Sequence, residues 1–200
     1  MLIPTDDTQI AHGGQYTLTV PAAPAQPLSA PSGPEWKEYL EADAFIQSDH
    51  PRILSQAKEI VGNEQDVWKK ALLINQWVFE NLNKVNVVSV PSALEVLQTR
   101  EGDCNEHTTL FVALARAAGI PSRAAIGLAW SETHRGFYYH AWPEVYAGRW
   151  IWMEPTFGQP IADATHIKLL AGNVEKWVQL LPFIGRLKLD VKAVEGVEQP

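Results

Sequence analysis

Residues 101–123 read EGDCNEHTTLFVALARAAGIPSR and predict a helix with both of its ends marked. The apolar residues in this segment recur at intervals of three and four, which gives one buried stripe along an amphipathic helix. Asp103 is a good N-cap residue, Glu106 occupies the capping-box position three residues later, and Gly119 is typical of a helix end. The predicted helix therefore begins at Cys104, which is the only cysteine in the chain.

The location of Cys104 indicates a reactive thiol. Unpaired backbone N–H groups and the helix dipole favour an anion at a helix start, so we expect the pKa of this thiol to fall below its usual value of about 8.5. Asp103 and Glu106 act in the opposite direction, so a cationic partner is needed to hold a thiolate at neutral pH. The alternative is a buried structural cysteine, but such residues usually lie among apolar neighbours. We therefore interpret Cys104 as a nucleophile.

The composition predicts one globular domain with an extended segment before it. The 200 residues are 46% hydrophobic and 20% charged, which is ordinary for a soluble domain with a core. Residues 21–34 are rich in proline and are expected to form an extended connector. We therefore expect residues 1–34 to be an extended segment and residues 35–200 to be the globular domain. If the protein is longer, residues 1–34 would be the end of a preceding domain.

The charge of the chain argues against two classes of partner. The formal net charge is −7, and the pI is about 5.3, so nucleic acid and anionic membrane surfaces are not expected to bind. No apolar run reaches the roughly 18 residues of a membrane span, and the first residues lack the features of a signal peptide. A single cysteine excludes a disulfide framework within the chain but does not fix the cellular compartment.

The periodicity of apolar residues predicts helices before strands. Helical patterns cover residues 35–47, 51–61, 64–82, with Asn63 as cap, and 91–98, ahead of the cysteine helix. Alternating patterns then predict strands at 122–130, 137–146 and 149–154, followed by a short helix at 174–181 and a further strand at 187–191. This order predicts an α+β fold with an antiparallel sheet rather than a parallel α/β fold.

One histidine is a candidate base for the thiol. A thiol nucleophile needs a base that takes its proton, and a third residue that orients the base. His140 lies inside the predicted strand 137–146, on the same face as Tyr138 and Trp142. An isolated histidine in such a strand is usually a half-buried sheet residue, but together with Cys104 it is better interpreted as the base.

The predicted hairpin supplies a candidate orienting acid. If Tyr146 to Gly148 form a three-residue loop, with the glycine in the left-handed conformation, Val145 pairs with Arg149 and His140 faces Glu154. The Cβ atoms of opposed residues are about 4.5–5.5 Å apart, so Glu154 could accept a hydrogen bond from Nδ1 of His140. A two-residue turn would instead place Glu154 on the other face of the sheet.

Three sequence blocks resemble the transglutaminase-like family over about residues 60–170. They are GDCNEH at 102–107 with its continuation to residue 123, HAWPEV at 140–145 and WMEPT at 152–156. The family is similar to papain-like cysteine proteases in core fold, with a cysteine helix packed on an antiparallel sheet. The resemblance implies Cys104 as nucleophile, His140 as general base and acid, and Glu154 as the orienting residue. Family members usually have aspartate at this last position, so Glu154 departs by one methylene.

The resemblance implies acyl transfer at amide bonds of a protein or peptide, through a thioester and without a cofactor. The backbone N–H of Cys104 and the side-chain amide of Gln98 are the candidate oxyanion donors. Hydrolysis of a peptidase or amidase type is expected, because no segment has the spacing of a calcium loop. Cross-linking of protein glutamine to an amine is the alternative.

Two non-catalytic interpretations also fit the sequence. A metal could be held by Cys104 and His107, together with His140 or with Asp163 and His166, but structural zinc sites usually contain more than one cysteine. We therefore expect no metal, and we interpret residues 163–166 as structural. A peptide-binding domain on the same fold is the second interpretation, and the intact cysteine, histidine and acid argue against it.

Overall fold

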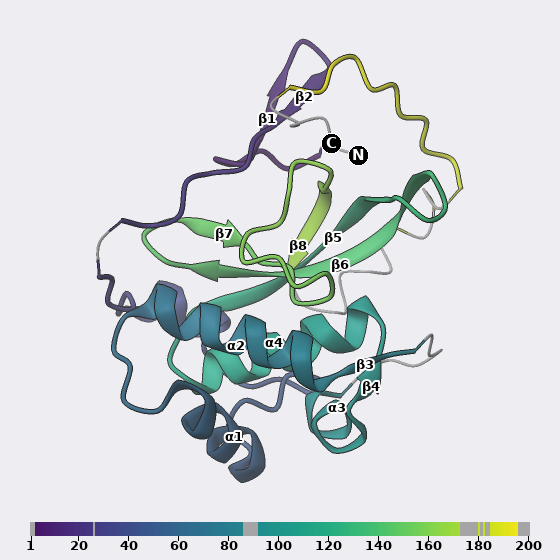
Figure 1. Ribbon diagram of the computed structural model, residues 1–200. Helices are drawn as coiled ribbons and strands as arrows, with labels where there is room; N and C mark the ends of the chain where they lie inside the picture. The colour runs from purple at the N-terminus through teal and green to yellow at the C-terminus, as the bar shows by residue number, and fades with distance from the viewer. Residues whose placement is uncertain are drawn as a thin grey trace.

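The computed structural model describes residues 3–25, 27–85, 92–172, 180, 182 and 185–195. Its helices form one layer and its main sheet forms a second layer on top of them (Figure 1). None of the helices in these residues is long and apolar enough to cross a membrane. The layered arrangement, with helices preceding an antiparallel sheet, confirms the predicted α+β fold.

The cysteine helix is the centre of the helical layer. It is α4, and its side chains from Glu106 to Arg116 are buried between the sheet and the other helices. The predicted capping box is confirmed, since the Asn105 N–H donates to Asp103 at 2.8 Å and the Asp103 N–H donates to Glu106 at 2.9 Å. The helices are α1 (Pro51–Val61), α2 (Val67–Asn81), α3 (Ala93–Thr99) and α4 (Cys104–Ala117).

The main sheet has four antiparallel strands in the order β7-β6-β5-β8. One face packs on α4 through residues such as Val145 and Ile151, whereas the other face carries Trp142 and Trp152 in a separate cluster. The sheet is formed by β5 (Ser122–Ser131), β6 (Gly136–Tyr146), β7 (Trp150–Trp152) and β8 (Ile167–Gly172). Two small pairs accompany it, the hairpin β1 (Gln9–His12) with β2 (Gln15–Leu18) and the parallel pair β3 (Asn83–Lys84) with β4 (Glu101–Gly102).

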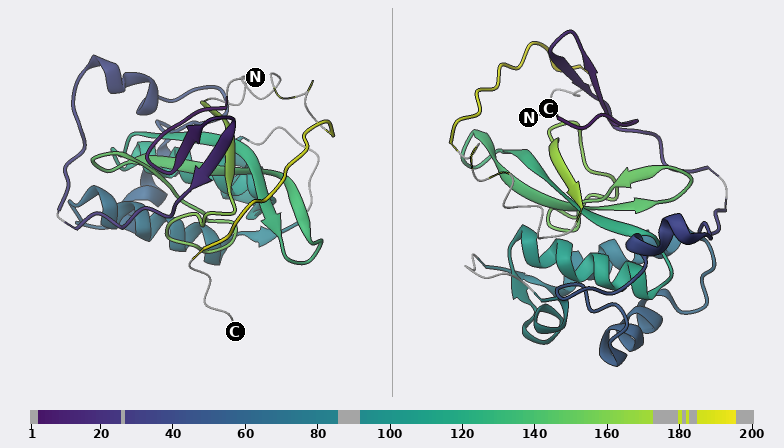
Figure 2. Two further views of the ribbon diagram at one scale, coloured as in Figure 1. Left: turned by 90° about the horizontal axis from the view of Figure 1, so that it is seen from above. Right: turned by 180° about the vertical axis from the view of Figure 1, so that it is seen from behind.

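The N-terminal hairpin lies on the side of the main sheet that faces away from α4 (Figures 1 and 2). The side chain of Gln9, which is fully buried, bridges the backbone of Lys168 by accepting from its N–H at 2.8 Å and donating to its carbonyl at 2.9 Å. The ammonium group of Lys168 bonds to Asp6 and Glu144. Polar contacts thus hold the segment before the hairpin to strand β8.

Four expectations about local structure need correction or fall outside the structure. The predicted helix at 35–47 is a 3-10 helix, Pro34–Tyr39, followed by irregular backbone. Asp66 rather than Asn63 caps α2, because its carboxylate accepts from the Lys69 N–H at 3.0 Å. Residues 187–191 do not form the predicted strand, and the predicted helix at 174–181 lies outside the described residues except for Leu180.

Candidate active site

Cys104 lies where the start of α4 meets the middle of β6. Its sulfur is hydrogen-bonded by the backbone N–H of Ala141, the residue that follows His140. Its side chain also packs against an apolar cluster that includes Ile126 and Leu128. The structure therefore brings the thiol next to the strand position of the predicted base.

The electrostatic surroundings of Cys104 correct one expectation. Shielding from water, then the charge of Asp103, with smaller effects of Glu154 and Glu106, raise the pKa of the thiol to about 12. The Ala141 N–H acts in the opposite direction. The expectation that the helix start would lower this pKa is wrong, because loss of hydration and nearby carboxylates outweigh the helix end. The resting residue is a neutral thiol.

The β6–β7 hairpin differs from the predicted register by two residues. Val145 pairs with Ile151 rather than Arg149, and Tyr146 pairs with Trp150. The three-residue loop is therefore Ala147 to Arg149, with Gly148 at φ 78° in its centre. Because side chains alternate with a period of two, a shift by two residues leaves Glu154 on the predicted face.

His140 and Glu154 are in direct contact. The His140 Nε2 atom lies 2.7 Å from Oε2 of Glu154, so the ring presents Nε2 rather than the expected Nδ1. A carboxylate can only accept, so this nitrogen carries the hydrogen, and in a neutral ring Nδ1 is left as the base. The ring of Phe157 stacks on the imidazole with centroids 4.7 Å apart and planes 7° apart. Both contacts fix the orientation of the ring.

The carboxylate of Glu154 is fully buried and fully hydrogen-bonded. Its Oε1 accepts from the backbone N–H groups of Thr156 at 2.8 Å and Phe157 at 3.0 Å. Its Oε2 accepts from His140 at 2.7 Å and from His166 at 3.0 Å. Burial alone would raise the pKa of Glu154, but the hydrogen bonds from both histidines lower it to about 2. The side chain is therefore an anion at neutral pH.

His166 is the residue at this site that sequence reasoning missed. We interpreted residues 163–166 as structural, yet His166 is fully buried and is bonded to the Glu154 oxygen that also binds His140. The segment leads into β8, which pairs with β5 and so brings His166 beside the site. A histidine just before a strand would have been a signal, but β8 itself was not predicted.

The close cluster of ligand-type side chains is not the one expected for a metal. Among the residues that the structure describes, His140, Glu154 and His166 bring their ligand atoms within 4.8 Å of one another, and Cys104 and His107 are not part of this set. Each of the three atoms already takes part in a hydrogen bond of 2.7 or 3.0 Å. Hydrogens on the two imidazole rings are sufficient to explain these two short contacts.

The remaining sequence candidates lie nearby but make fewer contacts. His107 is fully buried one turn after Cys104, with Nδ1 at 2.7 Å from the Asp103 carbonyl, and burial is the largest cause that lowers its pKa. Gln98 is exposed on α3, and within the described part of the chain its side-chain amide has no hydrogen-bond partner. The structure thus places Cys104 beside the backbone of Ala141 and brings His140 into contact with Glu154.

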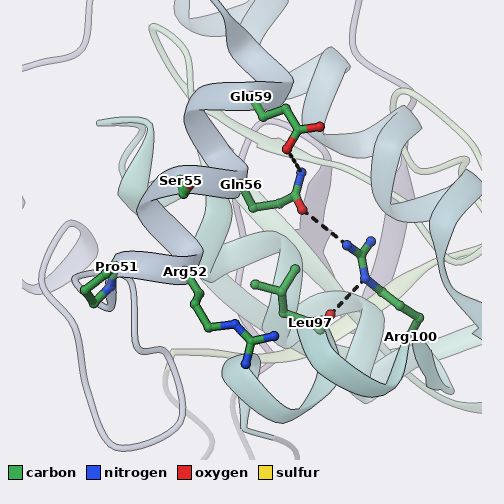
Figure 3. A pocket seen from close by; sticks show the side chains of 7 residues that line it. All are labelled: Pro51, Arg52, Ser55, Gln56, Glu59, Leu97 and Arg100. Carbon is green, nitrogen blue, oxygen red and sulfur yellow. Dashed lines mark hydrogen bonds between the residues drawn. The ribbon is translucent and has the colours of Figure 1, made fainter.

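Two cavities differ in their relation to this site. One of about 340 Å³ lies between α1 and α3 and is lined by none of the site residues (Figure 3). Arg100 in its wall donates to Gln56 at 3.2 Å and to the Leu97 carbonyl at 2.8 Å. The other, of about 280 Å³, includes Leu128 and Phe137, which belong to the apolar surroundings of Cys104. The second cavity therefore shares lining residues with the apolar cluster against which Cys104 packs.

Comparisons with known proteins identify the family of the chain. The model of the transglutaminase-like superfamily matches residues 55–155, just over half of the chain. A protein of Haemophilus influenzae described as uncharacterized is 36% identical over 97 residues, which is 46% of this chain and 26% of that protein. A structure from Cytophaga hutchinsonii described as "a Putative Cysteine Protease" is similar with a TM-score of 0.62 and 26% identity, over 70% of this chain and 48% of that one. The chain thus spans less than half the length of either relative.

Proposed function

The chain belongs to the transglutaminase-like superfamily, and on this premise we propose that it cleaves amide bonds of proteins or peptides through a thioester on Cys104. The hydrogen bond between His140 and Glu154 carries the proposal. It holds Nε2 protonated and leaves Nδ1 as the base, on the residue next to the one that bonds the sulfur. The similarity to the Cytophaga hutchinsonii structure described as "a Putative Cysteine Protease" supports hydrolysis as the reaction type.

The first step follows from the protonation states at rest. Because the pKa of Cys104 is raised, the thiol is neutral and loses its proton to Nδ1 of His140 as the sulfur attacks the carbonyl carbon. The new C–S bond moves the carbonyl electron pair onto oxygen. The backbone N–H of Cys104 at the start of α4 is the proposed donor to this oxyanion, with the exposed amide of Gln98 as the proposed second donor.

The second half of the cycle returns the proton. His140 gives its Nδ1 proton to the departing nitrogen as the C–N bond breaks, and the acyl group remains on Cys104 as a thioester. Water then loses a proton to His140 and attacks the thioester, which releases the acid and restores the thiol. A primary amine in place of water would give the cross-linking reaction instead. The scheme needs no cofactor, and buried Glu154 stabilises the transient His140 imidazolium.

The test uses the full chain with casein as a mixed protein substrate, with and without a fluorescent primary amine. We expect new peptide amino termini or released ammonia, together with a mass increase on Cys104 in the intact protein. The Cys104→Ala variant should lose at least about 10³-fold of the rate. Incorporation of the amine into casein would instead establish the cross-linking alternative. A rate that survives in Cys104→Ala would overturn the proposal.

A further inference from the structure

We propose that His166 is a positioning residue, an imidazole that is protonated at neutral pH and keeps the Glu154 carboxylate ionised and aimed at His140. Its role in catalysis rests on the proposed function, whereas its protonation state rests on the geometry alone. No sequence pattern indicated a catalytic role for this residue, and the family match ends at residue 155.

The partners of His166 determine where its hydrogens lie. Its Nε2 is 3.0 Å from Oε2 of Glu154. Its Nδ1 is 3.2 Å from the carbonyl oxygen and 3.2 Å from Oδ1 of Asp163. All three are oxygen acceptors, and a neutral ring would turn one bare nitrogen toward them. Both ring nitrogens therefore carry hydrogen, and the ring is a cation.

The acidic partner of His166 is itself fixed. Asp163 Oδ1 accepts from the Thr165 hydroxyl at 2.5 Å and from its N–H at 2.8 Å. The other oxygen of Asp163 accepts from the Gln159 amide at 2.8 Å. Burial alone would lower the pKa of His166, but Asp163 and then Glu154 raise it to about 9. The charged ring is thus retained through the neutral range.

The positive charge of His166 stabilises the buried Glu154 carboxylate and restricts its orientation. A buried glutamate has several rotatable bonds and a charge that water cannot solvate. Backbone N–H groups hold one of its oxygens, and His166 shares the second oxygen with His140. Removal of His166 would leave His140 as the only side-chain donor to Glu154, and the carboxylate would lose its buried counter-charge.

The charge of His166 also bears on His140, because both rings bind Oε2 of Glu154. Among the residues that the structure describes, the charged and titratable groups in contact with the His166 ring are Glu154, Asp163 and His140, whose ring centroid is 5.5 Å away. The uncharged rings of Trp142 and Phe157 also lie against it. A positive charge beside Glu154 offsets the attraction of that carboxylate for a proton on His140.

The protonation state is tested first, by NMR of the full chain with ¹⁵N-labelled histidine between pH 5 and pH 9. We expect one histidine that keeps both ring nitrogens protonated at pH 8, and the loss of this signal in His166→Gln. A bare ring nitrogen on every histidine at pH 7 would overturn the proposal. So would one equivalent of zinc in the purified protein that disappears in His166→Gln, because a metal would then replace the ring protons.

The positioning role is tested by the pH dependence of Cys104 alkylation with iodoacetamide. In His166→Gln, the midpoint of the His140-assisted rate should move upward by about one pH unit, whereas exposed His134→Gln should leave it unchanged. A less stable His166→Gln with an unmoved midpoint would show a structural role only. If that variant does not fold, Asp163→Asn takes its place, with a lowered His166 pKa in the NMR titration as the expected result.

The two proposals fail separately. Equal alkylation of the parent and His140→Ala would contradict the proposed function and leave the NMR result on His166 standing. An imidazole at residue 166 that is neutral at pH 7 would contradict this inference and leave amide cleavage by Cys104 untouched.

Discussion

Two buried ion clusters lie on the same face of the main sheet, and they differ in what their carboxylates bind. The histidine network consists of His140, Glu154, Asp163 and His166. The lysine network consists of Asp6, Arg123, Glu144 and Lys168. Each is built around a fully buried glutamate, and His166 is only two residues before Lys168 in the sequence. Burial and charge alone do not distinguish them.

The two networks differ in the side chains that bind the buried glutamate. Glu144 is bound by the Lys168 ammonium group and by the Arg123 guanidinium group, each at 2.5 Å. Lysine and arginine side chains ordinarily keep their charge near neutral pH. Glu154 is held by two imidazoles, of which His140 is the one proposed to exchange a proton with the thiol while His166 stays charged. The histidine network also reaches the surface, since the Phe157 ring that covers His140 is 46% exposed. The same kind of buried ion pair thus forms a stabilising contact in the lysine network and a proposed proton-transfer site in the histidine network.

Lys168→Met breaks the lysine network and should have the largest effect on stability. It leaves Asp6 and Glu144 as buried or partly buried carboxylates without their shared cation. Loss of one partner from a buried ion pair costs about 3–5 kcal/mol of the free energy of unfolding. Urea unfolding measures this loss, with exposed Lys37→Met as control. Loss of amide cleavage in a folded Lys168→Met variant would contradict the proposed division, in which the lysine network serves stability and the histidine network serves catalysis.

Glu154→Gln and Glu144→Gln form a matched pair, since both glutamates are fully buried. Glu154→Gln should lower kcat by about 10²-fold, because the amide no longer stabilises the His140 imidazolium. Glu144→Gln should lower the free energy of unfolding and leave kcat of the folded protein unchanged. Steady-state kinetics and urea unfolding of both variants measure the two effects. Equal loss of kcat in both would mean that the networks do not divide function and stability.

The dependence of stability on pH should carry the signature of the histidine network. Glu154 titrates at about 2 in the folded protein against an ordinary 4.5, so its contribution is present above pH 4.5 and is lost as the pH falls toward 2. His166 titrates at about 9 against an ordinary 6.5, so its contribution is present below pH 6.5 and is lost as the pH rises toward 9. Urea unfolding should therefore show the largest contribution between pH 4.5 and 6.5.

Glu154→Gln provides the control for that profile. It should flatten the acid side, because the residue no longer titrates, whereas Lys37→Met should preserve the parent's profile. Stability of the parent that keeps rising from pH 6.5 to pH 9 would be inconsistent with a protonated His166.

Phe157→Ala should have the smallest effect. The exposed Phe157 ring stacks on the His140 imidazole and makes no hydrogen bond to it. Ring contacts of this kind contribute about 0.5–1.5 kcal/mol. We expect kcat to fall by about two- to tenfold and the free energy of unfolding to change little. Phe157→Leu, which keeps an apolar cover, should recover part of the rate. A loss as large as that of Glu154→Gln would show that the ring does more than orient the imidazole.

The sequence was sufficient where local rules apply. The capping box at Asp103 and Glu106 and the placement of Glu154 on the face of His140 follow from helix capping and strand alternation. Ring rotation is not a property of the sequence pattern, so the contact through Nε2 rather than Nδ1 was not accessible. The raised pKa of Cys104 depends on desolvation, which only the packed structure defines.

Strand β8 shows why His166 was missed. Its segment places Lys168 in a buried position, against the alternation of apolar and polar residues that identifies a strand. Asp6 and Glu144 make that burial possible, and Asp6 comes from a segment more than 150 residues away in the chain. Without the strand, a link between residue 166 and Glu154 could not be inferred.

The most direct test of the account is the alkylation rate of Cys104 by iodoacetamide, measured from pH 6 to pH 10 in the parent and in His140→Ala. The raised thiol pKa predicts that His140 must assist the reaction near neutral pH. The parent should therefore react about tenfold or more faster than the variant at pH 7, and the two rates should converge toward pH 10. Superimposed rates over the whole range would contradict the assignment of His140 as the base of Cys104.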